Sequence, residues 1–536
     1  MTDKKVLLGD EAVALAAIHA GLTAGYSYPG TPASEIMEYL IREMNSSDGF
    51  KSFWCVNEKV AFEEALGVSF SGKRTMVSMK HVGLNVAADP FMNASLTKIN
   101  GGLVVVVADD PGMHSSQNEQ DSRYYAHFAR VICLEPSSSQ EAYEMTRQAF
   151  DLSEKYHIPV MIRMVTRLSH SRSLVKPGES RPENKKSQSE WTDWTLLPAN
   201  ARRRFEELLK IQGDLLRESE NSLFNQLNLN KEDHYLGIIA SGIGYNYVME
   251  NISRLKNTPS LLKVSFYPLP LSLVKKLVDH VENLLIVEEG YPFIETFITG
   301  LYGIPGKKIR GKLSGDLSLT GELSPDSVRQ SLGLSSLERI EVKDLPLAAR
   351  PPQLCQGCPH ADTFLALNKV LEDYPEASVF SDIGCYTLGA LPPYKAIDTC
   401  VCMGASVSMA KGGADAGVFP SVAVIGDSTF AHSGMTPLLD AASYNTNMTV
   451  IIVDNAAVAM TGGQPTFATG DILVSIVKGL GVVPGHIRVI TPLPRNRDEM
   501  INVLKEEIEY KGTSVVIASR ECVHEVRKKK KGKSSR

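Results

Sequence analysis

The stretch SVAVIGDSTFAHSGMTPLLDAASYNTNMTVIIVDNAAVAMTGG, residues 421–463, decides the fold of this chain. Its first apolar run, VAVIGD, has the length of a buried strand and ends in Asp427. After a helix-like segment the second run, VIIVDN, ends in Asn455. Buried strands joined by a helix are typical of a parallel sheet covered on both faces. Such sheets bind ligands at the carboxyl ends of their strands, so we expect Asp427 and Asn455 to lie together at a binding site.

Oxygen-bearing groups near these strand ends predict a site for a hard cation and a diphosphate. Mg²⁺ prefers carboxylate, amide and carbonyl oxygens, which Asp427, Asn455 and the backbone of Ala457 would supply. Gly426 and Gly404 would let the backbone approach phosphate closely. The pattern resembles the thiamine diphosphate motif, in which Gly-Asp-(Gly/Ser) is followed after about 25 residues by Asn. The alternative is two ordinary strand ends that carry turn-forming Asp and Asn.

The rest of the chain divides into segments of different composition. Residues 1–175 alternate strand-like and helix-like runs, which predicts a first parallel-sheet domain, and residues 234–345 resume this pattern in a smaller domain. Between them, the polar residues 176–233 predict a linker with one charged helix. Residues 346–526 form the domain that contains the stretch quoted above. The lysine-rich residues 527–536 predict a disordered tail. The predicted fold class is therefore α/β.

The composition is that of an ordinary globular protein, with 43% hydrophobic and 22% charged residues. A formal net charge of −5 gives no general sign of nucleic-acid binding. The longest apolar runs fall well short of the ~20 residues that span a bilayer, and the first residues do not resemble a secretory signal. We therefore expect a cytoplasmic protein without a membrane or nucleic-acid partner. Eight cysteines do not make a disulfide scaffold in so long a chain, and the C-x-x-C at 355–358 is more typical of metal binding or redox chemistry.

Over nearly its whole length the sequence resembles the large subunits of indolepyruvate:ferredoxin oxidoreductases. YPGTPASEI, NEKVAFEEALG, MKHVGLNVAADP and VVVADDPGMHSSQNEQDSRYYAHFA are similar to the pyrimidine-binding domain of that family. LCQGCPH, SDIGCYTLGALPP, CMGAS and DNAAVAMTGGQP are similar to its diphosphate-binding domain. The resemblance implies two doubly wound parallel-sheet domains of the thiamine diphosphate-binding type. A smaller domain like the transketolase C-terminal domain would lie between them in the sequence.

The resemblance also implies a reaction and its partners. Thiamine diphosphate attacks the 2-oxo group of an aryl pyruvate, carbon dioxide leaves, and iron–sulfur clusters oxidise the resulting enamine. Coenzyme A takes the acyl group, and ferredoxin or another carrier takes the electrons. The expected partner is a small catalytic-gamma-type subunit, in a dimer of heterodimers. Two alternatives are a non-oxidative thiamine-dependent decarboxylase that yields an aldehyde and a thiamine-binding scaffold without activity of its own.

Particular residues acquire roles from the same resemblance. Glu58 matches the glutamate that promotes ylid formation, although an acid at a helix start is also favoured by the helix dipole, and Glu63 and Glu64 compete with it. Thr31 is either a substrate or cofactor contact or a turn residue, and His360 is either a cofactor contact or structural. Further cofactor-binding residues are expected at Gly30, His81, Asn85, Gly404, Gly426, Asp427, Ser428, Asn455, Met460 and Thr461. Substrate-binding residues are expected at Thr31, Lys80, Gln117 and Arg123, with Ser116 and Gln120 in the same polar cluster as Arg123. Arg123 could form a bidentate pair with the substrate carboxylate, and the alternative for these polar residues is an ordinary surface loop.

Four cysteines match the positions that hold a [4Fe–4S] cluster beside thiamine in related enzymes: Cys355, Cys358, Cys385 and Cys522. Zinc in a four-thiolate site and unligated buried thiols are the alternatives. The other four cysteines are expected to be small apolar core or loop residues. Large subunits of this family usually continue into a ferredoxin-like module with two C-x-x-C-x-x-C-x-x-x-C-P runs, and this sequence contains none. We therefore expect electrons to leave through a partner that carries clusters, or to an acceptor other than ferredoxin.

Overall fold

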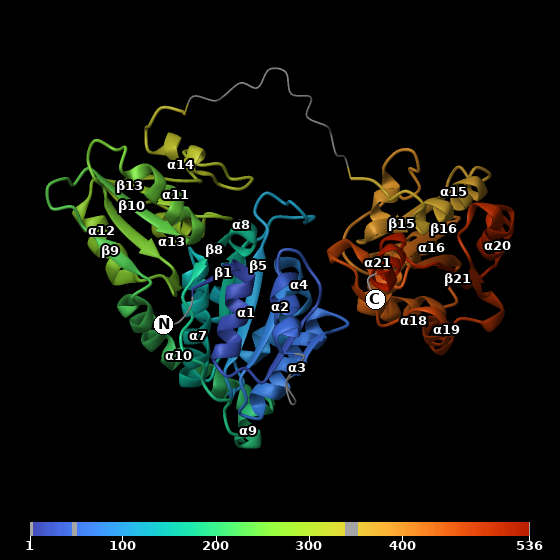
Figure 1. The fold of residues 1–536 in the computed structure, drawn as a ribbon, viewed down its shortest axis with the longest axis horizontal. Helices are drawn as coiled ribbons and strands as arrows, with labels where there is room; N and C mark the ends of the chain where they lie inside the picture. Colours follow the sequence, from blue (N-terminus) through green and yellow to red (C-terminus); the bar gives the residue numbers. More distant parts are fainter. Residues whose placement is uncertain (1–3, 45–50, 338–351, 535–536) are drawn as a thin grey trace. The chain divides into compact units, whose positions relative to one another are not determined.

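The computed structural model describes residues 4–44, 51–337 and 352–534. The chain forms two compact units, Met1–Glu341 and Val342–Arg536 (Figure 1). The domain boundary predicted at residues 345–346 lies outside the described residues. The prediction of an α/β fold with parallel sheets is confirmed in both units. Within the described ranges, no helix is both long and apolar enough to cross a membrane.

The first unit is built on a seven-stranded sheet in the part of the chain that the structure describes. All neighbouring strands are parallel except the last pair, β12 with β6. Strands β4 and β5 are buried along their whole lengths, as expected for a sheet covered on both faces. The strand order is β12 (Phe266–Tyr267), β6 (Cys133–Leu134), β7 (Val160–Val165), β5 (Leu103–Asp109), β4 (Thr75–Lys80), β2 (Ala24–Ser27) and β3 (Lys51–Trp54).

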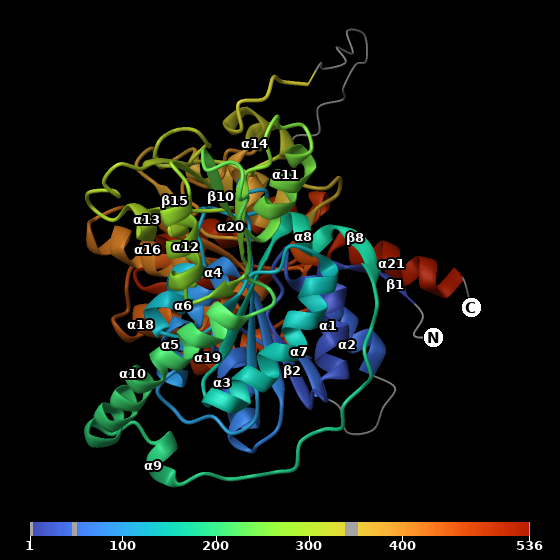
Figure 2. The ribbon, with the colours of Figure 1, turned by 90° about the vertical axis from the view of Figure 1, so that its left-hand side faces the viewer.

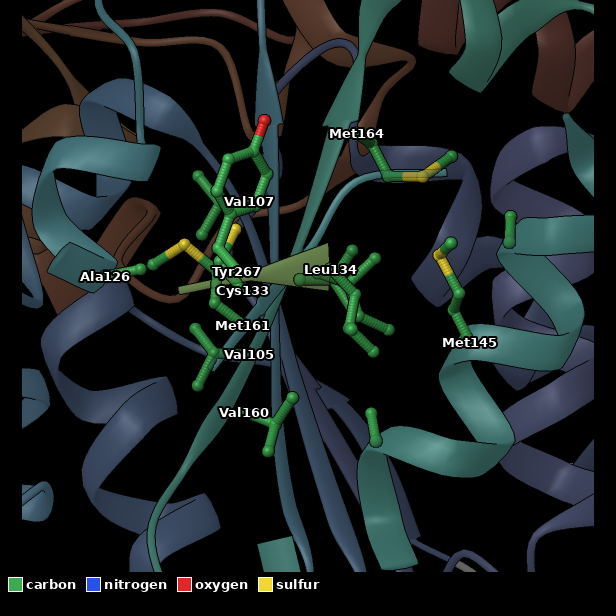
Figure 3. Close-up of a cluster of buried hydrophobic side chains, with 14 of the residues drawn as sticks. Val105, Val107, Ala126, Cys133, Leu134, Met145, Val160, Met161, Met164 and Tyr267 are labelled. Carbon is green, nitrogen blue, oxygen red and sulfur yellow. The ribbon is translucent and has the colours of Figure 1, made fainter. Parts of the chain in front are cut away.

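Helices cover this sheet and place polar residues after its strands. Helix α1 (Gly9–His19) packs on both α2 (Ser34–Met44) and α7 (Ser139–Tyr156), and α3 (Glu58–Phe70) packs on α5 (Ala88–Ala94). Helix α4 (His81–Val86) begins directly after β4, and α6 (Arg123–Ala129) lies between β5 and β6 in the sequence. Figure 3 shows the two sides of β6, with Cys133 toward Ala126 of α6 and Leu134 toward Met145 of α7.

A second sheet in the same unit has the order β14, β13, β10, β11, β9. Its strands are β14 (Lys308–Arg310), β13 (Asn283–Val287), β10 (Leu236–Ser241), β11 (Ser260–Val264) and the antiparallel β9 (Gln226–Asn228). It carries α11 (Gly242–Ile252), α12 (Leu271–His280), α13 (Phe293–Thr299) and α14 (Pro325–Ser331). Strand β12, from the segment predicted as the smaller domain, pairs with β6 of the first sheet. The two sheets are therefore joined through the backbone as well as through side chains.

A buried ionic cluster joins the carboxyl ends of strands from both sheets. Arg163, in β7, donates to Asp109 at the end of β5 (2.6 Å), to Glu135 after β6, and to the backbone oxygen of Glu289 after β13 (3.1 Å). Both partners of the Arg163–Asp109 pair have fully buried side chains. Charges buried this deeply persist only when paired and hydrogen-bonded, so the two sheets are fixed to each other at this edge.

The segment predicted as a linker with one helix differs from that prediction. Residues 176–190 run extended along the outside of the first unit, as Figure 2 shows, and they are held there by hydrogen bonds. The Arg181 amide donates to His19 O (2.8 Å), and the Ser187 amide donates to Ser71 O (2.9 Å). Two helices follow, α9 (Trp191–Trp194) and α10 (Pro198–Asn221), and then β9 joins the second sheet. Polar composition marked the segment as exposed but could not reveal these backbone contacts, which depend on distant residues.

The second unit contains a five-stranded, all-parallel sheet among its described residues. The order is β15 (Ser378–Ser381), β16 (Ser421–Gly426), β17 (Met448–Asp454), β21 (Thr513–Ser519) and β20 (Ile487–Ile490). The two strands within residues 421–463 are neighbours, and their register pairs Gly426 with Val453. Helices α15 (Pro359–Leu371), α16 (Ala405–Asp415), α18 (Met435–Ser443), α19 (Gly470–Gly479) and α20 (Arg497–Glu509) belong to this unit.

The prediction of a disordered tail from residue 527 is wrong for the part that the structure describes. Helix α21 runs over Val523–Ser534. Lys528 donates to the backbone oxygen of Gly462 (2.9 Å), which holds the helix against the loop after β17. Lysine and arginine have good intrinsic helix propensity, so a run of them continues a helix once tertiary contacts have started it.

Candidate functional site

The carboxyl end of β16 carries a buried carboxylate with an unused oxygen. Asp427 is 2% exposed, and its Oδ1 accepts a hydrogen bond from the Ser428 amide (2.8 Å). Among the described residues, Oδ2 has no hydrogen-bond partner, and the same holds for the Ser428 hydroxyl. Burial, and then the nearby Asp454, raise the pKa of Asp427 well above its ordinary value. A buried carboxylate of this kind requires a proton or a cation beside it, so the donor set fits a bound Mg²⁺.

The end of β17 supplies the amide and carbonyl groups that were predicted beside Asp427. Asn455 accepts the Ala457 amide through Oδ1 (3.1 Å), and its Nδ2 lies 3.2 Å from His360 Nε2. Ala456, between them, has a φ of +59°, so the backbone turns sharply here. Burial lowers the pKa of His360 to about 4, which leaves the imidazole neutral at pH 7. His360 thus lies against Asn455, and its role as a cofactor contact remains a prediction.

Asp454 was not singled out from the sequence, although it is a buried carboxylate at the same strand end. Its oxygens accept hydrogen bonds from Thr469 Oγ1 (2.6 Å), the Gly470 amide (3.0 Å) and Ser519 Oγ (2.8 Å). These partners tie the loop after β17 to the start of α19 and to the end of β21. Asp454 therefore shapes the loop that carries Asn455 and Ala457. Its place directly before Asn455 was the available signal.

Two glycines in this unit are required by close packing. Gly404 has a φ of +85°, and a Cβ there would lie 2.6 Å from the Cβ of Ser433. A Cβ on Gly426 would lie 2.6 Å from a ring carbon of Tyr386. Contacts this short do not occur for real side chains, so both positions demand glycine. Gly404 directly precedes α16, and the approach of these two glycines to phosphate remains a prediction.

A second buried carboxylate, also missed from the sequence, holds the start of α16. Asp382 lies after β15, and its Oδ2 accepts the Ser406 amide (3.2 Å) and hydroxyl (2.6 Å). The Tyr386 hydroxyl donates to its other oxygen. Burial raises the pKa of Asp382 to about 6. The strand-end rule that selected Asp427 would also have selected Asp382, had β15 been recognised as a strand.

The four predicted cluster cysteines are neighbours. Burial and then the thiols of Cys358, Cys522 and Cys355 raise the pKa of Cys385 to about 12. The Cys522 amide donates to Asn455 O (3.0 Å), which places this set beside the end of β17. Across the described chain, no group of three or more His, Cys, Asp or Glu side chains is arranged to hold a metal ion.

The other cysteines separate into two kinds. Cys55 and Cys133 are buried, as expected of core residues. Cys400 and Cys402 are exposed and belong to the loop before Gly404. Met460, in the short helix Ala459–Thr461, is 53% exposed, and the Thr461 hydroxyl donates to Gln464 Oε1 (2.7 Å). Both Met460 and Thr461 remain predictions as cofactor contacts.

In the first unit, Glu58 is the first residue of α3 and is 6% exposed. Asn57 caps the helix by accepting the Val60 amide (2.8 Å). The Glu58 carboxyl packs against α4 so closely that a Cβ on Gly83 would lie 2.5 Å from its Oε1. The competing acids Glu63 and Glu64 are exposed. Burial and fixed position therefore favour Glu58 as the residue that contacts the cofactor.

Residues at or after the ends of β2, β4 and β5 meet in the first unit. Lys80 Nζ donates to Ser115 O (2.7 Å) and Oγ (2.8 Å) and lies 3.8 Å from Asp110. The Ser115 hydroxyl also lies 3.2 Å from Thr31 O, and a Cβ on Gly30 would lie 3.1 Å from the Lys80 Cβ. Burial lowers the pKa of Lys80 to about 8 even though Asp110 opposes the shift. Gly30, Thr31 and Lys80 thus form one cluster with the loop 110–120.

The remaining predicted residues of this unit lie around that cluster. Ser116 donates to Asp110 (2.6 Å), and Gln117 is exposed in the same loop, with Gln120 half-buried. His81 Nε2 lies 3.3 Å from Asn118 O, whereas its buried Nδ1 has no partner among the described residues. Asn85 Oδ1 accepts the Tyr125 hydroxyl (2.6 Å). His81 therefore retains one free ring nitrogen, and Asn85 is already engaged.

The prediction that Arg123 binds a substrate carboxylate is wrong. Arg123 is 1% exposed and belongs to the ionic cluster that joins the two sheets. Its guanidinium donates to Asp121, to Glu288 Oε2 (2.9 Å), and to the backbone oxygens of Glu289 and Tyr291 (3.1 Å each). A guanidinium has five N–H donors, and these partners leave it without solvent access or a spare fork for a ligand.

Two family models match this chain, one in each of its two compact units. Residues 15–199 match the family described as "Pyruvate flavodoxin/ferredoxin oxidoreductase, thiamine diP-bdg", and residues 382–518 match "Thiamine pyrophosphate enzyme, C-terminal TPP binding domain". The chain is 39% identical to the indolepyruvate oxidoreductase subunit IorA of Archaeoglobus fulgidus, over 97% of this chain and 86% of the relative. It is 38% identical to the subunit of the same name from Methanothermobacter marburgensis, over 97% and 87%.

A solved structure shares the fold. It is a 2-oxoglutarate:ferredoxin oxidoreductase from Magnetococcus marinus with 2-oxoglutarate, coenzyme A and succinyl-CoA bound. The superposition has a TM-score of 0.52 at 17% identity and covers 62% of this chain and 66% of that one. At this level of identity the likeness concerns the fold alone.

Proposed function

The chain belongs to the family of indolepyruvate oxidoreductase subunits IorA, and from that premise we propose that it is the large subunit of a thiamine diphosphate-dependent oxidoreductase acting on aryl pyruvates. The reaction converts a 2-oxo acid and coenzyme A into acyl-CoA and carbon dioxide, with release of a proton and two electrons. One observation carries the proposal. It is the buried Asp427 at the end of β16, whose Oδ2 has no partner among the described residues.

The second unit would hold the diphosphate and its cation. Mg²⁺ would bind Asp427 Oδ2, Asn455 and the Ala457 carbonyl, which are the oxygen ligands that this ion prefers. Gly404, at the start of α16, and Gly426 with Ser428, at the end of β16, would lie against the phosphates. When bound, thiamine diphosphate would supply a nucleophilic thiazolium carbon and a positively charged ring that acts as an electron sink.

The first unit would hold the pyrimidine ring and the substrate. Glu58 is buried and would exchange a proton with the ring, and Gly83 is the residue that leaves room for its carboxyl group. His81, the first residue of α4, offers a ring nitrogen that has no partner among the described residues. Thr31 and Lys80 would bind the 2-oxo acid. Lys80 would contribute a cation, which Ser115 holds at the end of β4. Gln117 is a further candidate from the exposed part of the same loop.

Electrons would leave through one [4Fe–4S] cluster on Cys355, Cys358, Cys385 and Cys522. Each iron of a cubane binds one thiolate, so the thiolates need not converge on a single ion. The hydrogen bond from Cys522 to Asn455 O supports a position beside the diphosphate residues. A small catalytic-gamma-type subunit and ferredoxin, or another iron–sulfur carrier, would complete the enzyme. Coenzyme A would accept the acyl group. The Magnetococcus marinus enzyme, which shares the fold, has coenzyme A and succinyl-CoA bound.

The test is an anaerobic assay of the full chain together with its small subunit. With indolepyruvate, Mg²⁺ and thiamine diphosphate, we expect reduction of a one-electron dye that depends on coenzyme A, and formation of an aryl-acetyl-CoA. An aldehyde formed without dye reduction would identify a decarboxylase instead. Cofactor binding by calorimetry without any turnover, in the presence of the partner, would identify a scaffold.

A further inference from the structure

The first unit contains an apolar cavity that the proposed reaction does not use. Its volume is about 650 Å³, within the range of small-molecule sites. Side chains from α6, α10, α12 and α13 and from β12 surround it, so the cavity is formed within one compact unit. Cys133, Leu215 and Tyr267 form buried parts of its wall. Figure 3 shows Cys133 and Tyr267 packed with Val105 and Val107, so this wall is continuous with the core.

We propose that this cavity binds an amphipathic carboxylic acid, with its apolar body among the buried residues and its carboxylate at the mouth beside Arg130. Nothing in the proposed reaction requires such a site. The inference therefore stands apart from the proposed function and is tested separately.

The side chains that line the interior of the cavity favour a ligand whose apolar part is a ring or a short alkyl chain. Phe293 and Phe297 pack edge-to-face (ring centroids 4.9 Å apart), and His127 packs edge-to-face on Phe297 (4.7 Å). Val274 and Ile304 add aliphatic surface to the lining. Apolar bodies gain roughly 25 cal/mol for each Å² they bury, so a lining of this composition selects for carbon rather than for polar groups.

The charges at the mouth favour an anion. Arg130 lines the cavity, is exposed, and has a backbone oxygen that accepts a hydrogen bond from Gln212 Nε2 (3.1 Å). Lys275 is the other nearby cation, but it pairs with Asp279 (2.7 Å). Arg123 also lines the cavity, yet its donors are used within the ionic cluster. Arg130 is therefore the cation that can form a bidentate pair with a carboxylate.

One helix connects this cavity with the candidate active site. Arg123, Ala126, His127 and Arg130 have i, i+3, i+4, i+7 spacing, so one face of α6 and its cap line the cavity. Tyr125 lies off that face and donates to Asn85 of α4. An acid bound in the cavity would restrain α6, and α4 would experience that restraint through the Tyr125–Asn85 hydrogen bond.

The experiment titrates the full chain with 3-phenylpropionate and with octanoate by calorimetry. We expect saturable binding of at least one acid. Leu216→Trp should weaken this binding at least about 10-fold, because the larger side chain fills the cavity. A tenfold change corresponds to ~1.4 kcal/mol. Leu209→Trp, on the same helix at a 41% exposed position outside the lining, should leave it unchanged.

A second pair of variants keeps the test valid if Leu216→Trp fails to fold. Arg130→Ala should weaken binding of the acid by about 10-fold but not binding of 3-phenylpropionamide, which lacks the charge. Arg254→Ala, at another exposed arginine, should weaken neither. Stronger binding of 3-phenylpropionate identifies a ring-bearing ligand, and stronger binding of octanoate identifies an alkyl one. The proposal is overturned by lack of binding to the wild type or by binding that survives Leu216→Trp. It is also overturned by dimerisation of the wild type that Leu216→Trp abolishes, because a second copy would then be the occupant.

Discussion

At the scale of the residue, Asp427 combines a cost to stability with a role in binding. Because the pKa of Asp427 is raised, its ionised carboxylate destabilises the fold when no cation is bound. The protonated carboxyl group contributes its full stability below the unfolded pKa, and this stability is lost as pH rises toward the folded pKa. Asp427→Asn should therefore raise the melting temperature of the cofactor-free chain at pH 8 and abolish the stabilisation by thiamine diphosphate with Mg²⁺. Differential scanning calorimetry with and without both ligands measures the two effects. Unchanged stabilisation in the variant would place the metal elsewhere.

Glu58 allows a second test at the same scale. Glu58→Gln preserves shape and burial, so thiamine diphosphate should still bind. Exchange of its thiazolium C2 proton should slow by roughly 10²–10⁴-fold, which is the usual loss when an acid–base group is removed. Glu63→Gln is the matched control, because Glu63 lies on the same helix, is exposed and pairs with Lys59. NMR in heavy water measures the exchange rate. A slow rate in the control instead would transfer the role to Glu63.

At the scale of the element, the segment between β21 and α21 connects the cysteines to the diphosphate residues. Cys522 follows β21, and its amide bonds the backbone of Asn455 after β17. In anaerobic protein we expect roughly four irons per chain, and none in the double variant Cys355→Ser with Cys358→Ser. Cys400→Ser with Cys402→Ser is the control, because this pair is exposed and outside the proposed set. Iron and sulfide analysis decides the matter, and equal losses in both variants would argue against a specific cluster.

At the scale of the whole molecule, the buried cluster between the two sheets of the first unit makes stability depend on pH. Burial raises the pKa of Glu289 to about 7, although the Leu323 amide, Lys312 and Arg163 oppose the shift. A carboxyl group with a raised folded pKa contributes its full stability below its unfolded pKa, here 4.5, and loses it as pH rises through about 7. The loss approaches about 3 kcal/mol, at 1.36 kcal/mol for each pH unit.

Glu289→Gln tests this dependence. The amide keeps an acceptor for the Leu323 amide (3.1 Å) and removes the ionisation. The variant should lose less melting temperature than the wild type between pH 5 and pH 8. Glu250→Gln, at an exposed position of α11, is the control and should follow the wild type. Parallel pH profiles for Glu289→Gln and wild type would show that Glu289 does not titrate in this range.

The sequence by itself determined the α/β class, the parallel strands and the strand-end residues. Apolar runs of strand length separated by helical segments are local signals, and parallel strands present their carboxyl ends at one edge. This is why Asp427 and Asn455 were found, and both directly follow their strands, whereas Lys80 is the last residue of β4. The roles of these residues in binding remain predictions. Asp382 escaped only because its short strand, β15, was not recognised.

The tertiary structure alone decided which polar groups are already used. Arg123 looked available in the sequence, but its partner Glu288 lies 165 positions away. The extended residues 176–190 and the helix α21 likewise depend on contacts with distant backbone, at Ser71 and Gly462. Strand β12 crosses into the first sheet for the same reason. Periodicity and composition report on neighbours in the chain, whereas burial and hydrogen-bond partners arise from packing between segments that the sequence keeps far apart.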